Sequence, residues 1–290
     1  MKRNLRAGEM RGKSERLRRV EGRHNALVKD LRRAFRQGQP TEDGYFAIEG
    51  VRIIDEAIRS GCQLRAIFFS DSAGARVDHL LPQISSSTEA LILPDLLFES
   101  AVLTESPQGV AALVRLAEHA SMESIIAGAD LRPIVVAAGI QDPGNLGTVL
   151  RSAEAFGAAG ILFGEGTVSE WNPKTVRASA GSIFRIPCAH AKLAESIVAL
   201  RAAHCRLFAT SSHQGTPLWN ANLTPALAVF IGNEGAGIPK EILHQMDDII
   251  AIPQSPSVES INAGVAASIV LYESARQRGQ ASAVMASKRS

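Results

Sequence analysis

Three segments in the second half of the chain combine glycines with side chains that can take part in chemistry. Residues 141–151 have the sequence QDPGNLGTVLR, residues 231–239 have IGNEGAGIP, and residues 252–262 have IPQSPSVESIN; each follows an apolar run. Glycine lets a ligand approach the backbone closely. Guanidinium, carboxylate and amide groups can orient a substrate or stabilise charge that develops during a reaction. The candidates for this chemistry are Asn145, Arg151, Glu234 and Asn262.

Each segment also has a simpler interpretation as a turn between a strand and a helix. Asn145 can cap the helix that follows it, which would leave Arg151 on the surface. Ser260 is a natural N-cap for the final helix, although capping alone does not explain Asn262, a poor helix former, in its first turn. The glycines of residues 231–239 have the order G-x-x-G-x-G. This order matches neither the dinucleotide fingerprint nor the phosphate-binding loop.

Two series of strands and helices position these segments. In the first series we expect helices at 25–37, 51–59 and 94–103, strands at 45–50, 64–69, 91–93 and 109–116, and a loop-rich stretch at 71–88. In the second we expect strands at 133–138, 160–163, 183–186, 206–209, 227–231 and 249–252, and helices at 146–156, 173–180, 193–203, 239–246 and 261–278. This alternation predicts an α/β fold with a mostly parallel sheet, in which ligands bind at the carboxyl ends of the strands.

The same pattern divides the chain into a smaller N-terminal α/β domain at 23–116 and a second α/β domain at 132–280. We expect a flexible basic arm at 1–22, a linker at 117–131 and a mobile tail at 281–290. Residues 1–36 contain 13 Lys and Arg and four acidic residues, a balance of +9, whereas the rest of the chain has a balance of −7. A basic block of this kind suits a polyanion such as nucleic acid, although a solvated tail also fits it.

Composition argues against several other classes of protein. Cys62, Cys188 and Cys205 form no C-x-x-C pair, and the histidines form no H-E-x-x-H pattern. Neither a disulfide framework nor a metal site is therefore expected. No apolar run reaches the roughly 18 residues of a transmembrane helix, and the basic N-terminus lacks the apolar stretch of a secretory signal. We expect a cytoplasmic protein that does not associate with membranes.

The three segments together resemble the motifs of the SpoU/TrmH family of RNA ribose 2′-O-methyltransferases. The matching patterns are N-L-G-x-x-x-R, I-G-N-E-G-x-G-[IL] and I-P-x-x-x-x-x-E-S-[LI]-N-A-x-x-A, in this order. The resemblance covers residues 134–273. A weaker one over residues 25–116 is to the ribosomal-protein-L30e-like substrate-binding domain of longer family members. It is carried by FAIEGVR at 46–52 and SPQGV at 106–110.

The third motif departs from the usual pattern at three positions. Pro256 stands where the family usually has glycine, Gln254 where it often has methionine, and Ile261 where it has leucine. Proline fixes φ and removes a backbone donor. We therefore expect the loop around Pro256 to be stiffer, or differently shaped, than in other members.

The resemblance implies that the C-terminal domain contains a deep trefoil knot and that its loops bind S-adenosylmethionine, largely through backbone groups. It also implies a homodimer formed through this domain, so that the active site can take residues across the interface. The residues that the resemblance assigns to the cofactor are Thr210, Ser211, Gly232, Asn233, Gly235, Ile252, Gln254, Ser260 and Ile261.

The implied reaction is attack of an RNA ribose 2′-hydroxyl on the sulfonium methyl group, without a metal ion. Arg151 matches the family's catalytic arginine. Because a guanidinium stays protonated, stabilising a developing alkoxide and binding the adjacent phosphate suit it better than acting as a base. Asn145 and Asn262 would orient that arginine or the RNA. Glu234 would orient Arg151 or accept a proton.

The N-terminal domain and the arm would select the RNA through phosphate contacts, from Lys29, Arg32, Arg33, Arg36 and Arg52. Longer two-domain members act mostly on ribosomal RNA, which favours it over transfer RNA. Two other interpretations stay open. A non-catalytic RNA-binding protein of the same fold is supported only by Pro256. A nucleotide-dependent metabolic enzyme would be expected to carry a phosphate or dinucleotide fingerprint, and the chain has neither.

Overall fold

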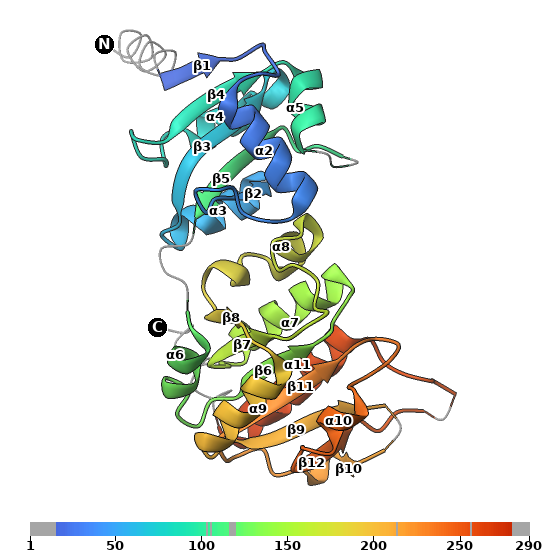
Figure 1. The fold of residues 1–290 in the computed structure, drawn as a ribbon. Helices are drawn as coiled ribbons and strands as arrows, with labels where there is room; N and C mark the ends of the chain where they lie inside the picture. Colours follow the sequence, from blue (N-terminus) through green and yellow to red (C-terminus); the bar gives the residue numbers. More distant parts are fainter. Residues whose placement is uncertain are drawn as a thin grey trace. The chain divides into compact units, whose positions relative to one another are not determined.

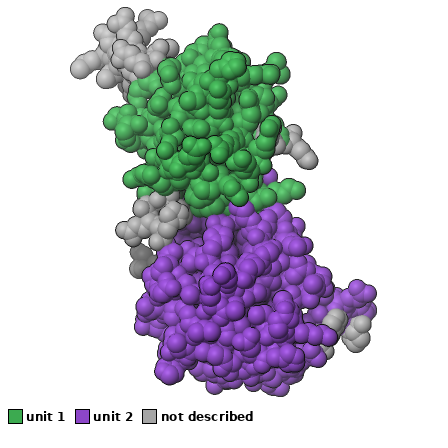
Figure 2. Space-filling view, in the orientation of Figure 1, with its two compact units in different colours: residues 1–117, 171–176 green, residues 118–170, 177–290 purple. Residues whose placement is uncertain are grey.

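The computed structural model describes residues 16–102, 104, 106–115, 120–212, 214–255 and 257–279. The chain divides into two compact units (Figure 2): residues 1–117 with 171–176, and residues 118–170 with 177–290. No helix among the described residues is long and apolar enough to cross a bilayer.

The first unit contains, within its described residues, a five-stranded mixed sheet (Figure 1). β5 runs antiparallel to its neighbours β2 and β3, whereas β4 is parallel to β1 and β3. Consecutive residues of β3, such as Ile67 and Phe68, are both fully buried. Because successive side chains of a strand point to opposite faces, both faces of this sheet are covered. The sheet order is β1 (Leu17–Arg19), β4 (Glu89–Leu93), β3 (Gln63–Ser70), β5 (Val110–Arg115) and β2 (Phe46–Glu49).

The helices of this unit begin and end at residues that explain their limits. They are α2 (Ala26–Gln37), α3 (Val51–Arg59), α4 (Ala75–Leu80) and α5 (Asp95–Val102), with a short 3-10 turn, η1 (Asp71–Ala73). The side chain of Asn25 accepts hydrogen bonds from the first turn of α2, and Gly38 ends that helix with a φ of 59°. Glycine adopts such a left-handed conformation more readily than residues with a Cβ atom. The helices predicted at 25–37 and 51–59 are therefore confirmed.

Two expectations for the N-terminal half are wrong. Leu17–Arg19 is not part of a flexible arm, because it pairs in parallel with β4 as an edge strand. Arg16 fixes this strand from the side by donating to the carbonyl oxygens of Leu81, Ile84 and Ser85. The predicted loop at 71–88 contains α4. Residues 1–15 of the predicted arm lie outside the described residues.

The second unit contains a seven-stranded sheet within its described part, and every pairing in it is parallel. β6, β7 and β11 are buried along their whole length, as expected for the centre of a parallel sheet covered on both faces. The sheet order is β10 (Thr216–Pro217), β12 (Asp248–Ala251), β9 (Arg206–Ser211), β11 (Leu227–Gly232), β6 (Ile134–Ala138), β7 (Gly160–Phe163) and β8 (Cys188–His190).

Five helices accompany this sheet in the described residues, and a sixth, α8 (Pro173–Ser179), is divided between the two units (Figure 1). α7 and α11 pack against each other over much of their length. The side chains of Ser152 and Ser268 are hydrogen-bonded between these two helices at 2.6 Å. The five helices are α6 (Met122–Ala127), α7 (Pro143–Ala155), α9 (Leu193–Ala202), α10 (Lys240–Leu243) and α11 (Ala263–Gln277).

The linker predicted at 117–131 is also wrong in its described part. Residues 122–127 form α6, which begins with a capping box at Ser121. Ile125 and Ala129 are 3% and 2% exposed and belong to the core beneath the sheet. The segment lacks a strand signal because it is a short helix, and its burial makes it part of the second unit. Residues 116–119 and the predicted tail at 281–290 lie outside the described residues.

Other differences concern short elements. The strand predicted at 183–186 is wrong: Ser182–Phe184 forms a 3-10 turn, η2, and the strand is β8 at Cys188–His190. β10, which has only two residues, was not predicted. Residues 171–176 belong to the first unit, where Trp171 stacks on Phe46 with ring centroids 3.6 Å apart. The second domain predicted at 132–280 is therefore not continuous in sequence.

Candidate active site at the carboxyl edge of the parallel sheet

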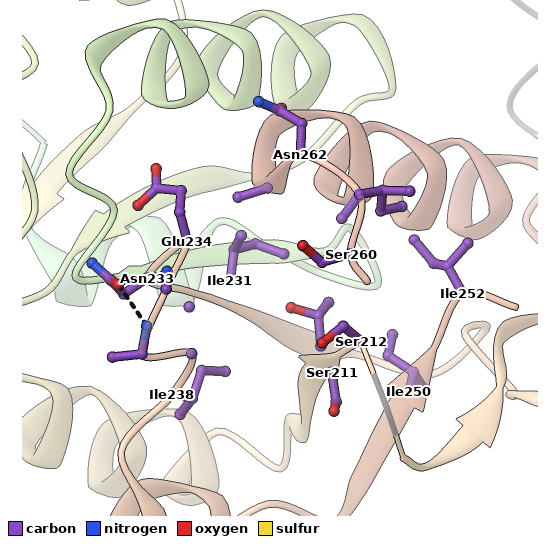
Figure 3. Close-up of a pocket in the computed structure, with 18 of the residues that line it drawn as sticks. Ser211, Ser212, Ile231, Asn233, Glu234, Ile238, Ile250, Ile252, Ser260 and Asn262 are labelled. Atoms are coloured by element: carbon purple, nitrogen blue, oxygen red, sulfur yellow. Dashed lines mark hydrogen bonds between the residues drawn. The ribbon is translucent and has the colours of Figure 1, made fainter. Parts of the chain in front are cut away.

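A cavity of about 440 Å³ lies where β9, β11 and β12 end and α11 begins. Figure 3 shows side chains from these elements arranged around it. Its position agrees with the rule that parallel sheets bind ligands at the carboxyl ends of their strands. Its walls combine aliphatic side chains with hydroxyl, amide and backbone groups. The lining residues are Asn145, Thr210, Ser211, Ser212, Gln214, residues 231–238, Leu243, Ile249, Ile250, Ile252, Gln254, residues 260–263 and Ala266.

Most of the site residues predicted from sequence line this one cavity. They are Asn145, Glu234 and Asn262, and also Thr210, Ser211, Gly232, Asn233, Gly235, Ile252, Gln254, Ser260 and Ile261. Arg151 is absent from the lining. The sequence did not identify the aliphatic wall formed by Ile238, Leu243, Ile249 and Ile250. Such residues carry no signal of their own, because aliphatic side chains on strands and helices are ordinary core residues.

The loop after β11 is held in a tight curl by its own backbone and by Asn233. The backbones of Asn233 and Gly237 exchange two hydrogen bonds of 3.0 Å. The Asn233 side chain accepts from the N–H groups of Gly235 and Ala236 at 2.9 and 2.8 Å and donates to the Gly139 carbonyl at 3.0 Å. Figure 3 marks one hydrogen bond between Asn233 and the loop. Asn233 therefore shapes the loop rather than reaching outward, and the spacing of glycines in the sequence reflects this curl.

Gly232 lies at the closest approach within this loop. A Cβ atom at Gly232 would come within 2.6 Å of the Gly237 carbonyl carbon and 2.8 Å of the Ile238 backbone nitrogen. Real Cβ atoms essentially never come so near to backbone atoms. The loop can close on itself only because this residue has no side chain.

Asn145 lies at the centre of a hydrogen-bond network that joins the three segments. Asp142, not Asn145, is the N-cap of α7, since its side chain accepts from the Asn145 N–H at 2.8 Å. Asn145 is thus free of the capping role and is only 6% exposed. Its amide nitrogen donates to Glu234 at 2.8 Å, and its amide oxygen accepts from Asn262 at 2.5 Å. Through this residue α7, the β11 loop and the start of α11 are held together.

Asn262 is the N-cap of α11, in place of the Ser260 expected from sequence. Its side-chain oxygen accepts from the Val265 N–H at 3.1 Å while its nitrogen donates to Asn145. Gly264 allows this contact, because a Cβ there would come within 2.9 Å of the Thr148 side chain on α7. One amide therefore begins α11 and ties it to α7, which explains an asparagine at this position.

Glu234 accepts hydrogen bonds from three donors at the beginning of α7. They are the Asn145 side chain and the backbone N–H groups of Gln141 and Asp142, at 2.8 to 3.2 Å. Partial burial alone would raise the pKa of Glu234, but these hydrogen bonds outweigh it and hold the pKa below its ordinary value of 4.5. An ionised carboxylate with these partners is suited to positioning Asn145 and poorly suited to accepting a proton.

Arg151 is separate from this network in the single chain. It is exposed on α7, six residues after Asn145. It makes no hydrogen bond or ion pair with any residue that the structure describes. The expectation that Glu234, Asn145 or Asn262 orients Arg151 is therefore not met within one chain, where these three residues bond to one another instead.

Gln254 contributes a polar group whose hydrogen bonding is incomplete. Its amide nitrogen donates weakly to the carbonyl oxygens of Ser212 and Glu259, both at 3.4 Å. Its amide oxygen is buried and has no donor among the described residues. A buried acceptor without a partner is costly, so this side chain is suited to rearranging around a bound ligand. Pro256, the residue expected to alter the loop, lies outside the described residues.

The cations predicted to bind RNA lie in the first unit. Lys29, Arg32, Arg33 and Arg36 line a separate hollow of about 220 Å³ on α2, together with Gln37. Arg52 is exposed in the first turn of α3 and is not part of this hollow. Nowhere in the described part of the chain do three His, Cys, Asp or Glu side chains gather in a way that could hold a metal ion.

Comparison with known proteins agrees with the geometry of this site. Residues 132–272 match the SpoU rRNA Methylase family, and residues 25–112 match the MRM3-like substrate binding domain. A 23S rRNA (uridine(2479)-2′-O)-methyltransferase from Streptomyces viridochromogenes is 31% identical over 248 residues, which cover 82% of this chain and 85% of that protein. The chain belongs to the SpoU rRNA methylase family.

Other relatives in the SpoU family match nearly end to end. The 23S rRNA (guanosine(2553)-2′-O)-methyltransferase RlmP of Bacillus subtilis is 29% identical over 256 residues, covering 88% of this chain and 98% of the relative. The AdoMet-bound rRNA methyltransferase of Sinorhizobium meliloti superposes with a TM-score of 0.78 and 26% identity, covering 90% and 98% of the two chains. The SpoU methyltransferase AviRb with AdoMet gives a TM-score of 0.74 at 27% identity, covering 88% of this chain and 98% of AviRb.

Proposed function

We propose that this protein transfers a methyl group from S-adenosylmethionine to a ribose 2′-hydroxyl of ribosomal RNA. The observation that carries the proposal is the single cavity that gathers all three sequence motifs and joins them through Asn145. Related structures of the same family were solved with AdoMet bound. Relatives that match over most of this chain are named 23S rRNA 2′-O-methyltransferases.

The cavity suits S-adenosylmethionine in size and in chemistry. Its volume of about 440 Å³ lies in the range of small-molecule sites. The aliphatic wall of Ile238, Leu243 and Ile250 suits the adenine ring. Hydroxyl, amide and backbone groups opposite suit the ribose and the amino-acid part, and the unsatisfied oxygen of Gln254 suits an N–H donor. When bound, the cofactor supplies a methyl group on a sulfonium, which is already activated for transfer to an oxygen nucleophile.

The residues of the network act as positioning groups in this proposal. Glu234 keeps the Asn145 amide in one orientation, and Asn145 in turn fixes Asn262 at the start of α11. Because each side chain in this series of hydrogen bonds has a fixed donor or acceptor role, the network holds the walls of the cavity in place before a ligand enters. Holding the reacting groups in line is a large part of the rate advantage that an enzyme can supply.

Arg151 would act on the RNA in this reaction. As a permanently charged fork of N–H donors, it suits the phosphate beside the target ribose and the negative charge that develops on the 2′-oxygen. Its exposure and lack of partners among the described residues leave the guanidinium available for that role. We expect Arg151→Ala to bind S-adenosylmethionine with unchanged affinity and to lower the transfer rate by about 10²–10³. Arg151→Lys, which keeps charge but loses the fork, should recover part of the rate.

The proposed assembly is a homodimer formed through α11. Val265, Ile269 and Tyr272 follow one another at helical spacing and are 46%, 36% and 48% exposed. Apolar stripes of this kind are rarely left in water. Because α7 packs on α11, a dimer through this stripe would bring Arg151 near the interface. This would account for a catalytic arginine that lies outside the cavity of its own chain.

The proposed fold detail is a trefoil knot in the second unit. The strand order supports it. β12 pairs with β9 on the side away from β11. The chain must then return past β9 and β11, because α11 packs against α7. Residues 25–112 match the MRM3-like substrate binding domain. We also propose that residues 23–116 form an L30e-like domain that binds the RNA substrate. The cytoplasmic location expected from the sequence stays a prediction.

The proposed activity is tested by mapping ribose 2′-O-methylation across total RNA from cells with and without the gene. One ribosomal nucleotide should lose its methyl group, and the purified protein with S-adenosylmethionine should restore it. Loss at a transfer RNA position would replace the proposed substrate. A purified protein without calorimetrically detectable S-adenosylmethionine binding would instead favour a non-catalytic RNA-binding protein.

A further inference from the structure

The hollow on α2 has an unusual lining. Apart from Gln37, all its residues are cations: Lys29, Arg32, Arg33 and Arg36. Their spacing of three, four and seven residues places them on one face of the helix. The opposite face is apolar and buried through Leu27, Val28, Leu31, Ala34 and Phe35. Like charges on neighbouring turns of a helix repel and destabilise it, so a cation of this face that has no partner in the fold needs another explanation.

Arg32 and Arg33 are held in place by other residues of the unit. Arg32 donates to the carbonyl oxygen and the hydroxyl of Ser100 at 3.2 and 3.0 Å. Ser100 lies in the last turn of α5, where a cation is favoured by the helix dipole. Arg33 donates to Gln37 at 3.3 Å and pairs with Glu42 at 2.8 Å. Arg32 is therefore oriented by the end of α5, whereas the charge of Arg33 is partly compensated by Glu42 at the surface.

Lys29 and Arg36, by contrast, are exposed and form no hydrogen bond or ion pair with the described residues. They are seven residues apart, which corresponds to about 10 Å along the helix axis. Both charges are therefore available to a ligand at opposite ends of the hollow. Neither side chain supports the fold through a hydrogen bond or ion pair with a described residue, so its replacement by glutamine should leave the unit folded.

We propose that the hollow on α2 is a binding site for the ribose-phosphate backbone of RNA, in which Lys29 and Arg36 each neutralise one phosphate. This inference rests on the proposed function, because it assumes an RNA substrate. Of the five cations predicted to contact RNA, Lys29 and Arg36 are without partners among the described residues and Arg32 and Arg33 have them. Arg52 lies outside the hollow. Phosphate contacts fix the register of a nucleic acid and carry no sequence information. The site therefore binds RNA of any sequence, and specificity comes from other residues.

The test is the salt dependence of RNA binding by the full chain. A fluorescent single-stranded RNA of mixed sequence is titrated with the wild-type protein and with the double variant Lys29→Gln, Arg36→Gln at several salt concentrations. Each phosphate contact contributes about 0.7 to the slope of log affinity against log salt for single strands. The double variant should lower the magnitude of that slope by about 1.4.

The matched control removes two charges from the same unit outside the hollow. Arg18 and Arg59 are exposed, and among the described residues their ion pairs are with Glu89 and Glu56 respectively. Arg18→Gln, Arg59→Gln should keep the wild-type slope, and Lys29→Arg, Arg36→Lys should also keep it. Two results would overturn the site. One is the same salt slope for the wild type and for the Lys29→Gln, Arg36→Gln variant. The other is an equal decrease in slope for that variant and for Arg18→Gln, Arg59→Gln.

Failure of the proposed activity gives a different result. S-adenosylmethionine binding is followed separately by calorimetry on the same proteins. A protein that binds RNA through α2 but does not bind S-adenosylmethionine would contradict the proposed methyl transfer and keep the RNA site. If the protein binds S-adenosylmethionine normally but the salt slope of RNA binding does not depend on Lys29 and Arg36, the RNA site is contradicted and the proposed methyl transfer is kept.

Discussion

At the scale of single residues, Asn145 is the side chain that connects Glu234 to Asn262 by hydrogen bonds. Its buried amide joins Glu234 on one side to Asn262 on the other. Asn145→Ala would leave the Asn262 amide nitrogen without its acceptor and remove one of three donors to Glu234. Because Asn262 and Glu234 are exposed and can bond to water instead, each lost hydrogen bond should cost about 0.5–1.5 kcal/mol. We expect this loss in the free energy of unfolding, together with weaker binding of S-adenosylmethionine in calorimetry.

The control for this prediction is Asn222→Ala. Asn222 is exposed, and its side chain accepts only from Thr224 nearby. The control should be close to wild type in stability and in cofactor affinity. An Asn145→Ala protein with undiminished cofactor affinity would show that the network does not shape the cavity.

Glu234 is the residue whose ionisation can be tested directly. Its pKa in the folded chain is lowered, so its contribution to stability is complete above the ordinary value of 4.5 and is lost as pH falls through the lowered folded value. The rate of methyl transfer should therefore show no ionisation of Glu234 at neutral pH. A step in the pH–rate profile near neutrality that disappears in Glu234→Gln would identify Glu234 as a base and contradict this assignment.

The same variant has a predicted effect on stability. A glutamine can accept with only one oxygen, so its amide nitrogen would face the N–H groups of Gln141 or Asp142. We expect Glu234→Gln to lower the free energy of unfolding by about 1–2 kcal/mol at pH 7. Glu241→Gln on α10, an exposed carboxylate in the same unit, should have little effect. Urea unfolding of the two variants makes the comparison.

The sequence identified which residues carry the chemistry but not how they are connected. Asn145, Glu234 and Asn262 were found because amides and a carboxylate in glycine-rich turns have no packing role. Their mutual hydrogen bonds join residues about 90 to 120 positions apart, and local pattern contains no information on such contacts. The caps were misassigned for a related reason. Asp142 and Asn262 compete with Asn145 and Ser260 for the same role, and propensity ranks these residue types almost equally.

At the scale of elements, the β11 loop depends on a glycine that cannot be replaced cheaply. Gly232→Ala would bring a methyl group against the backbone of Gly237 and Ile238, which flexible side-chain motion cannot relieve. We expect a loss of about 1–3 kcal/mol in the free energy of unfolding, as for overpacked cores. Gly235→Ala in the same loop is the matched control, because its Cβ would meet only the Asn233 side-chain oxygen at 3.7 Å. It should stay within about 0.5 kcal/mol of wild type, as measured by urea unfolding.

Elements with strong periodicity were predicted well, and those held by distant contacts were not. α2 and α3 begin and end where apolar spacing and capping residues place them. β1 has only three residues, two of them arginines, and exists because β4 offers an unpaired edge. Ile183 and Phe184 lie in a 3-10 turn, and the edge strand β8 begins a few residues later, at Cys188. Tertiary pairing decides such short segments, and periodicity cannot.

At the scale of the whole molecule, the fold class could be predicted because strand–helix alternation determines a parallel sheet. The order of its strands could not, because β9 lies between β11 and β12 only after the chain has passed across the sheet and returned. The unit boundary at residues 171–176 was hidden for the same reason. Trp171 belongs to the first unit through its stacking on Phe46, a contact over more than a hundred residues.

The proposed homodimer gives the last prediction. Ile269 lies in the middle of the exposed apolar stripe of α11. In Ile269→Glu, a carboxylate would be transferred from water into the interface of a dimer formed through this stripe, at a cost of several kcal/mol. We expect the wild-type protein to have twice the mass of the chain in sedimentation equilibrium, and Ile269→Glu to have the mass of one chain.

Val198→Glu is the matched control, because Val198 is a 70% exposed aliphatic residue on α9. It should stay dimeric and active. If the active site needs Arg151 from a second chain, the monomeric Ile269→Glu protein should lose methyl transfer while it remains folded by circular dichroism. A monomeric variant with full activity would place Arg151 in the site of its own chain, and a wild-type monomer would remove the dimer altogether.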